Sequence, residues 1–368
     1  MEIAEKSSIL YRAEVINKIF NGADYAGIPY CILRNYSGLP NSTLGGDIDL
    51  IISPNNKKDW RAHLESVVLL HDLDLGVIQV HYHGIRYCVF NVKKSIFLKL
   101  DVHYGEYWRG VEYMSADHIF KSVKLFHSFR IPSNENEAIL SLLDPLVTGG
   151  KARPKYEDIV VSGINNKNKF VKTLRDIVGE SVAGDIVYFI ENGKYMEIST
   201  LSNKVRWNLW FRMFFKSYGG VLLSIHKYLI YEFQRRNSLL GYLLILDGTD
   251  EDIKRFLKRF LQTSGNDFPG VAINSDSINI PHKFVTPIDS VFKHLLQSYN
   301  IVIGPYSLLK ERVIGKSKFN LKKQIILTIV QDRVVIKQKE YAFDGAIQRV
   351  YIEIMNSYIK KYKILFKE

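Results

Sequence analysis

The chain has 368 residues, which is more than one typical domain, so two or three domains are expected. Hydrophobic residues make up 46% and charged residues 24% of it, which is typical of a globular protein with a core and excludes a disordered or fibrous chain. The formal net charge of +12 favours an anionic partner, such as a nucleotide, a nucleic acid or an acidic membrane surface, without choosing between them.

The two cysteines, Cys31 and Cys88, lie in apolar strand-like runs and form no CxxC pair. Buried thiols and a reducing cytoplasm are therefore expected. Residues 1–15 are acidic and lack a long apolar stretch, so no signal peptide is predicted. No window approaches 18 uninterrupted apolar residues, the length that would indicate a membrane-spanning helix.

Residues 8–26 are predicted to form a helix capped by Ser7 or Ser8, because their apolar residues recur at helical spacing. A short strand at 30–33 and a turn-rich loop at 34–42 follow. Further elements expected before residue 200 are helices at 57–70, 135–143 and within 165–200, and a hairpin formed by 76–82 and 85–92.

In the run LGGDIDLII at 44–52, polar and apolar residues alternate from Asp47 to Leu50. Successive side chains of a strand point to opposite faces, so Asp47 and Asp49 share one face and Ile48, Leu50 and Ile52 share the other. The two carboxylates repel each other and are hard to bury, which a divalent cation such as Mg²⁺ would resolve. Gly45 and Gly46 would let a phosphate approach the backbone. The alternative is a solvated strand end after a Gly-Gly turn.

Residues 97–104 alternate in the same way and place Lys99, Asp101 and His103 on one polar face. If this strand lies beside the first, about 4.8 Å away, Asp101 joins the other two carboxylates in one cluster. Such a cluster suits the two-metal chemistry of nucleotidyl transfer. His103 would orient a substrate or act as a base, or it is a hydrogen-bonding neighbour of Asp101.

The helix at 135–143 has Ser133 as its candidate N-cap and is expected to end at Pro145. The following loop at 148–155 is basic and contains glycine. Lys151 in this loop either contacts a phosphate or substrate, or is part of a solvated loop.

Residues 205–236 are aromatic and basic together. They are predicted to be helical, either as an amphipathic pair at an anionic membrane surface or as an inter-domain helix whose aromatic residues pack on its neighbours. Beyond them, strands and helices alternate, which indicates a small parallel α/β domain. Its expected strands are 242–246, 270–273, 300–303 and 324–330, and its expected helices are 250–261, 290–298 and 343–363.

The run LGGDIDLII, with a third aspartate in LKLDVHY, resembles the core of the nucleotidyltransferase superfamily, which includes DNA polymerase beta and the aminoglycoside nucleotidyltransferases. The resemblance covers roughly residues 1–125. It implies that Asp47, Asp49 and Asp101 hold Mg²⁺, as in a two-metal site. The superfamily usually has a Gly-Ser pair some ten residues before the first aspartate, where this chain has Arg34. Arg34 would replace that pair as a phosphate ligand, or it forms a surface ion pair.

Residues 241–252 are similar to the strand and phosphate loop that open thymidylate-kinase-like domains. Glu251 stands where that loop has its lysine, and Asp252 where it has Ser or Thr. Two carboxylates would repel a triphosphate, so 238–368 is expected to be a degenerate, inactive kinase-like domain.

The chain is thus predicted to be α/β, with an N-terminal mixed sheet and a C-terminal parallel sheet. Its expected parts are a nucleotidyltransferase-like domain at 1–125, a helical extension at 126–204, linker helices at 205–237 and the kinase-like domain at 238–368. This order resembles bacterial proteins of surface-polysaccharide synthesis, which implies a sugar, polyol or lipid-linked glycan as the acceptor.

The leading hypothesis is a Mg²⁺-dependent nucleotidyltransferase that uses a nucleoside triphosphate. The alternative is a non-catalytic module that holds a polysaccharide-assembly complex at the membrane. Nucleic acid is the least favoured partner, because the positive charge is spread along the chain and no RNA-binding motif is present. The expected location is the cytoplasm, with peripheral contact at the inner face of the membrane through 205–236 as a further expectation.

Overall fold

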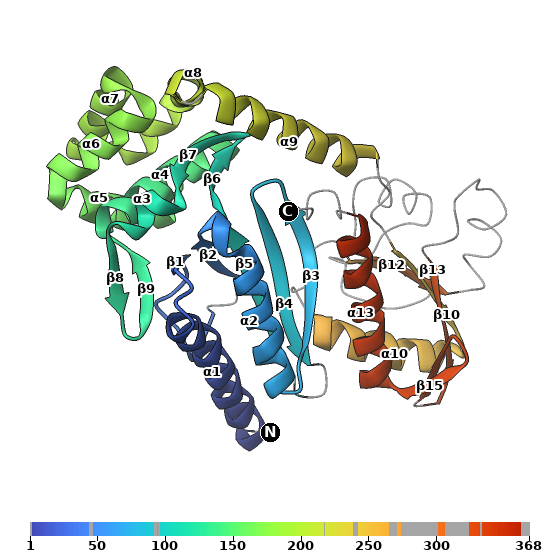
Figure 1. Cartoon of the computed structure of the whole chain (residues 1–368). Helices are drawn as coiled ribbons and strands as arrows, with labels where there is room; N and C mark the ends of the chain where they lie inside the picture. The colour runs from blue at the N-terminus through green and yellow to red at the C-terminus, as the bar shows by residue number, and fades with distance from the viewer. Residues whose placement is uncertain are drawn as a thin grey trace. The chain divides into compact units, whose positions relative to one another are not determined.

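The computed structural model of the chain describes residues 2–43, 47–91, 94, 96–216, 218–237, 242–264, 271–273, 301–305, 324–331 and 333–361 (Figure 1). The chain divides into two compact units. The N-terminal unit comprises Met1–Leu75, Gln79–Tyr87 and Leu98–Tyr231, and the C-terminal unit comprises Gly76–Ile78, Cys88–Phe97 and Glu232–Glu368. Both are built from helices and mixed or parallel sheets, which confirms the predicted α/β class.

A five-stranded sheet of order β1-β2-β5-β4-β3 is the centre of the first half of the chain. Its strands are β1 Tyr30–Arg34, β2 Ile48–Ile52, β3 Asp74–His81, β4 Gly84–Asn91 and β5 Ile96–His103. Strand β2 pairs antiparallel with β1 and parallel with β5. The sheet is therefore mixed, and β2 and β5 lie side by side although they are far apart in the sequence.

Two helices, α1 Glu2–Tyr25 and α2 Lys57–Leu70, cover one face of this sheet (Figure 1). The core beneath them is aromatic: the Phe20 ring lies 5.0 Å from Tyr30, 6.4 Å from Trp60 and 5.6 Å from Phe129, measured between centroids. All four side chains are fully buried. Helix α1 begins before Ser7 and Ser8, so the prediction that one of them caps it was wrong.

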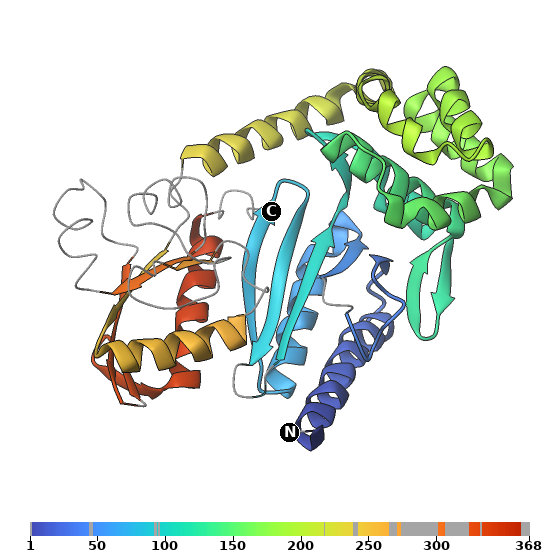
Figure 2. The same ribbon diagram turned by 180° about the vertical axis from the view of Figure 1, so that it is seen from behind.

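The opposite side of β1 and β2 packs against a second core that is mainly helical. Its helices are α3 Ala116–Phe120, α4 Asn134–Gly149, α5 Glu157–Gly163, α6 Lys167–Val178, α7 Glu180–Glu191 and α8 Ser202–Lys216, with 3₁₀ turns at Pro54–Asn56, Pro154–Tyr156, Ile164–Asn166 and Tyr195–Leu201. Helix α9 Tyr218–Asn237 follows. Two short ribbons, β6 Gly105–Trp108 with β7 Val111–Ser115 and β8 Val123–Phe126 with β9 Phe129–Pro132, precede α4. Figure 2 shows these elements from behind.

Helix α4 differs from its prediction at its end. Ser133 caps it as expected, its hydroxyl accepting from the Asn136 backbone N–H at 3.4 Å. Pro145 lies inside the helix, which continues to Gly149 and ends where Gly150 adopts a left-handed conformation with φ of 73°. The buried residues Leu146 and Val147 on the last turn gain enough packing to offset the hydrogen bond that proline removes.

The C-terminal unit contains a six-stranded sheet of order β11-β12-β10-β13-β14-β15. Its elements are β10 Tyr242–Asp247, α10 Asp250–Ser264, β11 Val271–Ile273, β12 Ile301–Pro305, β13 Gln324–Val330, β14 Arg333–Ile336, β15 Lys339–Ala342 and α13 Phe343–Lys361. The first four strands of that order pair in parallel, as predicted, whereas β14 and β15 add an antiparallel hairpin that was not predicted. The helix expected at 290–298 lies outside the described residues.

The loop between β10 and α10 is shaped by helix capping. The Thr249 hydroxyl donates to Asp252 Oδ2 at 2.8 Å and accepts from the Asp252 backbone N–H at 3.2 Å. Arg255 pairs with the same carboxylate. The Asp252 carboxylate therefore closes the first turn of α10.

A membrane-crossing segment was not expected, and none of the helices among the described residues has the length and apolar character to span a bilayer.

We expect Phe20→Ala to lower the free energy of unfolding of the N-terminal unit by about 4 kcal/mol, because it removes the ring that joins α1 to the sheet. All four tryptophans lie in this unit, so urea denaturation followed by tryptophan fluorescence reports on it. Tyr25→Ala on the same helix is the control: that side chain is 97% exposed, and its loss should cost less than about 0.5 kcal/mol. Equal losses in the two variants would contradict this account of the core.

Candidate functional site

Strands β2 and β5 bring two of the predicted carboxylates face to face. In their parallel register, Asp49 lies directly opposite Asp101, and Ile51 opposite His103. The adjacency on which the carboxylate cluster depended is therefore confirmed. Asp101 is 5% exposed, and its neighbour on the polar face, His103, is also largely enclosed.

Asp49, Asp101 and His103 form the group that could hold a metal ion among the described residues. One ligand atom from each lies within 4.8 Å of the others. Asp47, which precedes the first residue of β2, is not part of this group. Its carboxylate instead pairs with Arg86 of β4, at 3.2 Å from Nε to Oδ2, and with Lys99 of β5, at 3.3 Å from Nζ to Oδ1.

The chain supplies a cation to every carboxylate of the cluster. Arg86 donates to Asp101 through Nε, at 3.1 Å from Oδ2, and through Nη2. Arg34 Nε lies 3.3 Å from Asp49 Oδ2, and its Nη1 donates to Asp144 of α4 at 2.7 Å. The repulsion between neighbouring carboxylates, which suggested a metal, is thus already reduced by guanidinium groups.

A one-residue irregularity in β1 decides which side chain faces Asp49. Tyr30, Cys31 and Ile32 pair in regular antiparallel register with β2, but the register then shifts so that Arg34 opposes Asp49. Without this bulge Leu33 would occupy that place. Arg34 is therefore a partner of the carboxylates, with a side chain only 17% exposed, rather than a surface residue.

A chain of buried polar groups extends from the carboxylates behind β5. His103 Nε2 lies 3.6 Å from Asp101 Oδ1, His103 Nδ1 lies 3.0 Å from Glu106 Oε1, and Tyr113 donates to Glu106 at 3.3 Å. Burial alone would lower the pKa of His103, but Glu106 and Asp101 raise it well above its usual value. Burial alone would raise the pKa of Asp101, but His103 and Arg86 bring it well below the usual range.

Two further imidazoles lie beside His103 and differ from it in charge. Burial lowers the pKa of His81 to about 4 and that of His83 to about 3, so both are neutral near pH 7. The His83 ring lies 5.6 Å from His103 and stacks on Tyr107 at 5.7 Å. The wall of the site on this side is therefore aromatic and uncharged.

The donor set fits a divalent cation. Asp101 Oδ1 is buried and accepts no hydrogen bond from the residues that the structure describes, and Asp49 lies opposite Asp101 on the adjacent strand. Burial raises the pKa of Asp49, with Arg34 and His103 opposing the shift. Asp49 and Asp101 could hold a cation, whose charge would offset the repulsion between the two carboxylates.

Three predicted site residues remain. Gly45 and Gly46 lie outside the described residues. Lys151 is exposed just beyond α4, and no contact described for it involves the carboxylates.

Sequence reasoning missed Arg86, Glu106 and Asp144. Each carried a weak signal, since each is a charged residue within or beside an otherwise apolar run. Their role became visible only with the register of the strands and the packing of α4.

No protein-family model matches the chain, and no curated protein matches it. Among solved structures, it is similar to a crystal structure of a proposed nucleotidyltransferase from H. pylori. The identity is 13%, the alignment covers 55% of this chain and 96% of that one, and the TM-score is 0.27. A likeness at this level does not establish a shared fold.

We expect Arg86→Gln to lower the free energy of unfolding by about 3 kcal/mol, because it leaves two carboxylates of the sheet without their shared cation. Arg61→Gln is the matched control. Its partner Glu65 lies 2.9 Å away on the same helix, and both side chains are about half exposed, so its loss should cost less than about 1 kcal/mol. Urea denaturation gives both free energies of unfolding. An Arg86→Gln variant as stable as the parent would show that the carboxylates do not need this cation.

Proposed function

We propose that the N-terminal unit is a divalent-metal-dependent nucleotidyltransferase. It would transfer a nucleotidyl group from a nucleoside triphosphate to a hydroxyl or phosphate of an acceptor. The observation that supports this proposal most is the opposition of Asp49 and Asp101 on parallel strands, with a buried Asp101 oxygen that accepts no hydrogen bond from the described residues. The weak likeness to a proposed nucleotidyltransferase agrees with it but adds no argument.

In this proposal Asp49 and Asp101 hold Mg²⁺, and Asp47 is the third carboxylate. The metal, when bound, neutralises charge on the triphosphate and on the pyrophosphate that leaves. Asp47 would become available as a ligand if Arg86 and Lys99, which pair with it in this structure, bound the phosphates instead. The same proposal includes a second metal ion, held by these three carboxylates as in a two-metal site.

The other residues bind and orient. Arg34 would remain on Asp49 and Asp144, or move with Arg86 to phosphate oxygens. Glu106 fixes the imidazole of His103, which in turn orients Asp101. Gly45, Gly46 and Lys151 stay predicted contacts of the nucleotide. The sugar, polyol or lipid-linked glycan acceptor, the surface-polysaccharide pathway and the cytoplasmic location are proposed from the sequence resemblance.

A second candidate is a non-catalytic module that organises an assembly complex. One observation favours it: the carboxylates already have cationic partners from Arg34, Arg86 and Lys99, so the site is electrically balanced without a metal. The capped loop of the C-terminal unit, where Asp252 takes the place of a phosphate-loop hydroxyl, is consistent with the same role.

We expect Mn²⁺, used as a paramagnetic substitute for Mg²⁺, to bind the full chain, and Asp49→Asn and Asp101→Asn each to weaken binding about tenfold or more. Electron paramagnetic resonance of free Mn²⁺ measures the affinity. Asp59→Asn, which changes an exposed carboxylate at the start of α2, should leave it unchanged.

Turnover is tested by pyrophosphate release from each nucleoside triphosphate in the presence of sugar and polyol acceptors. The two site variants should reduce the rate by roughly a hundredfold. Absence of Mn²⁺ binding at millimolar concentration, in a folded protein, would overturn the enzymatic proposal and support the non-catalytic one.

A further inference from the structure

Helix α8 carries large apolar side chains on two faces, one of which is buried and the other exposed. Val205 and Leu209 on one face are fully buried in the core of the N-terminal unit. On the other face Trp207, Phe211 and Phe215 recur every four residues and are 64%, 49% and 76% exposed. The core therefore anchors this helix and leaves an aromatic stripe, defined by these three residues, without cover in the described structure.

Helix α9 continues the same character. Its side chains Leu222, Leu223 and Leu229 are 45%, 57% and 57% exposed. Exposed apolar residues scattered singly are ordinary on a protein surface, but successive helices with several large ones are not. Such a surface is typical of a site that binds a partner through apolar groups.

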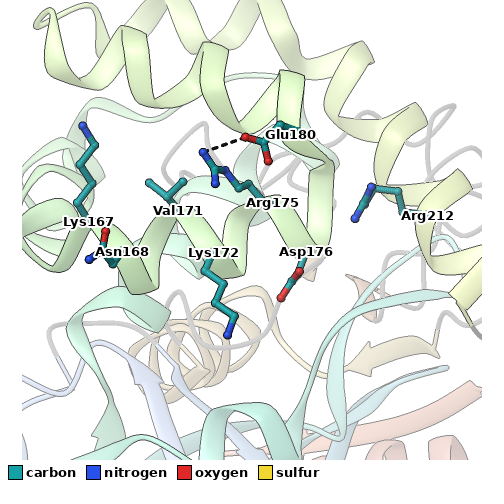
Figure 3. Close-up of a pocket in the computed structure, with 8 residues that line it drawn as sticks. All are labelled: Lys167, Asn168, Val171, Lys172, Arg175, Asp176, Glu180 and Arg212. Carbon is teal, nitrogen blue, oxygen red and sulfur yellow. Dashed lines mark ion pairs between the residues drawn. The ribbon is translucent and has the colours of Figure 1, made fainter.

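A basic pocket lies beside the aromatic stripe. It is a cavity of about 520 Å³ lined by residues of α6, by Glu180 at the start of α7 and by Arg212 of α8 (Figure 3). Lys167, Lys172, Arg175 and Arg212 outnumber the two acidic side chains, Asp176 and Glu180. Arg175 is paired with Glu180 at 2.9 Å, and Lys167 with Glu191 at 2.5 Å.

Arg212 lies between the aromatic stripe and the basic pocket. It follows Phe211 in the sequence, and Figure 3 shows its side chain extending from α8 toward α6. No ion pair is described for Arg212 or Lys172 among the residues that the structure describes, so both can meet an anion. Lys204, one turn before Trp207, adds a further exposed cation, 3.8 Å from Asp185.

We propose that the aromatic stripe of α8 and the adjoining basic pocket form a peripheral binding surface for an anionic phospholipid membrane. Tryptophan and phenylalanine enter the headgroup layer of a bilayer favourably, and arginine and lysine beside them bind lipid phosphate. The charge of the surface, within a chain of net charge +12, makes an anionic membrane the matching occupant. This proposal stands apart from the metal site and does not depend on nucleotidyl transfer.

Co-sedimentation of the full chain with vesicles tests the proposal. We expect the chain to bind vesicles of phosphatidylcholine in which about 30 mol% of the lipid is the anionic phosphatidylglycerol. Binding to vesicles of pure phosphatidylcholine should be much weaker. Salt at about 0.5 M should weaken binding to the vesicles that contain phosphatidylglycerol. Equal binding to the two kinds of vesicle, or no binding, would overturn the proposal.

The aromatic stripe is tested by the double variant Trp207→Ala/Phe215→Ala. Its partition coefficient should fall by about tenfold or more, because two apolar side chains no longer leave water. The matched control Tyr25→Ala/Leu70→Ala removes side chains that are 97% and 80% exposed elsewhere on the same unit, and it should bind like the parent. If the stripe variant instead changes only the oligomeric state in light scattering, the surface is an interface between copies and the proposal is wrong.

The pocket is tested by Lys172→Gln/Arg212→Gln against a control with the same charge change, Lys121→Gln/Lys254→Gln, at exposed positions. Each cation near the surface should contribute roughly fivefold to the affinity, so the first variant should lose about 25-fold and the control much less. Equal losses would show that only the overall charge matters. Full competition by millimolar inorganic phosphate would assign the pocket to a free anion and would also overturn the proposal.

Insertion of the aromatic stripe into the bilayer is measured by the quenching of tryptophan fluorescence with brominated lipids. Trp60 is fully buried and Trp108 and Trp210 are partly buried, whereas Trp207 is exposed. Trp207→Phe should therefore keep vesicle binding and lose most of the quenching. Binding without any quenching in the parent protein would contradict insertion of the stripe.

Discussion

The opposition of Asp49 and Asp101 across β2 and β5 is the interaction on which the N-terminal unit depends. Two carboxylates on adjacent strands are tolerable only if positive charge comes to them. Arg34 arrives from β1 through a one-residue bulge, and Arg86 arrives from β4 on the other side. Each of these placements constrains an element of the sheet. The bulge, the strand order and the docking of α4 through Asp144 can therefore be understood as parts of one charge balance.

This balance has a functional consequence. A site compensated by guanidinium groups is stable without a metal, yet those same groups are good ligands for phosphate. Binding of a nucleotide with its metal would exchange one set of partners for another: the carboxylates would take the metal and the guanidinium groups would take the phosphates. The free energy of this exchange is small compared with burying a bare charge, because no charge is left unpaired at either end. The catalytic and non-catalytic proposals differ only in whether the exchange occurs.

Helix α8 combines a packed face with an exposed aromatic face. One face closes the helical core through Val205 and Leu209, and the other presents the aromatic stripe beside the basic pocket. A helix that was only a connector between domains would not need a buried face of this kind. Because the core fixes the orientation of the helix, the proposed membrane binding of the stripe would avoid the entropy loss that a disordered segment incurs on binding.

The amino-acid sequence by itself determined the local structure and the polar faces. Period-two alternation assigned Asp49, Asp101 and His103 to their faces, and helical spacing located α2 at its observed bounds. The tertiary structure alone decided which charges meet. Arg86 and Glu106 gave little signal, since the partners of a side chain depend on the register of strands that are distant in the sequence, and a single bulge exchanges Leu33 for Arg34. Alternation is a property of neighbouring residues, whereas charge pairing is a property of packing. Pro145 shows the same limit of local prediction, because the buried contacts of the residues after it keep α4 helical although proline disfavours a helix interior.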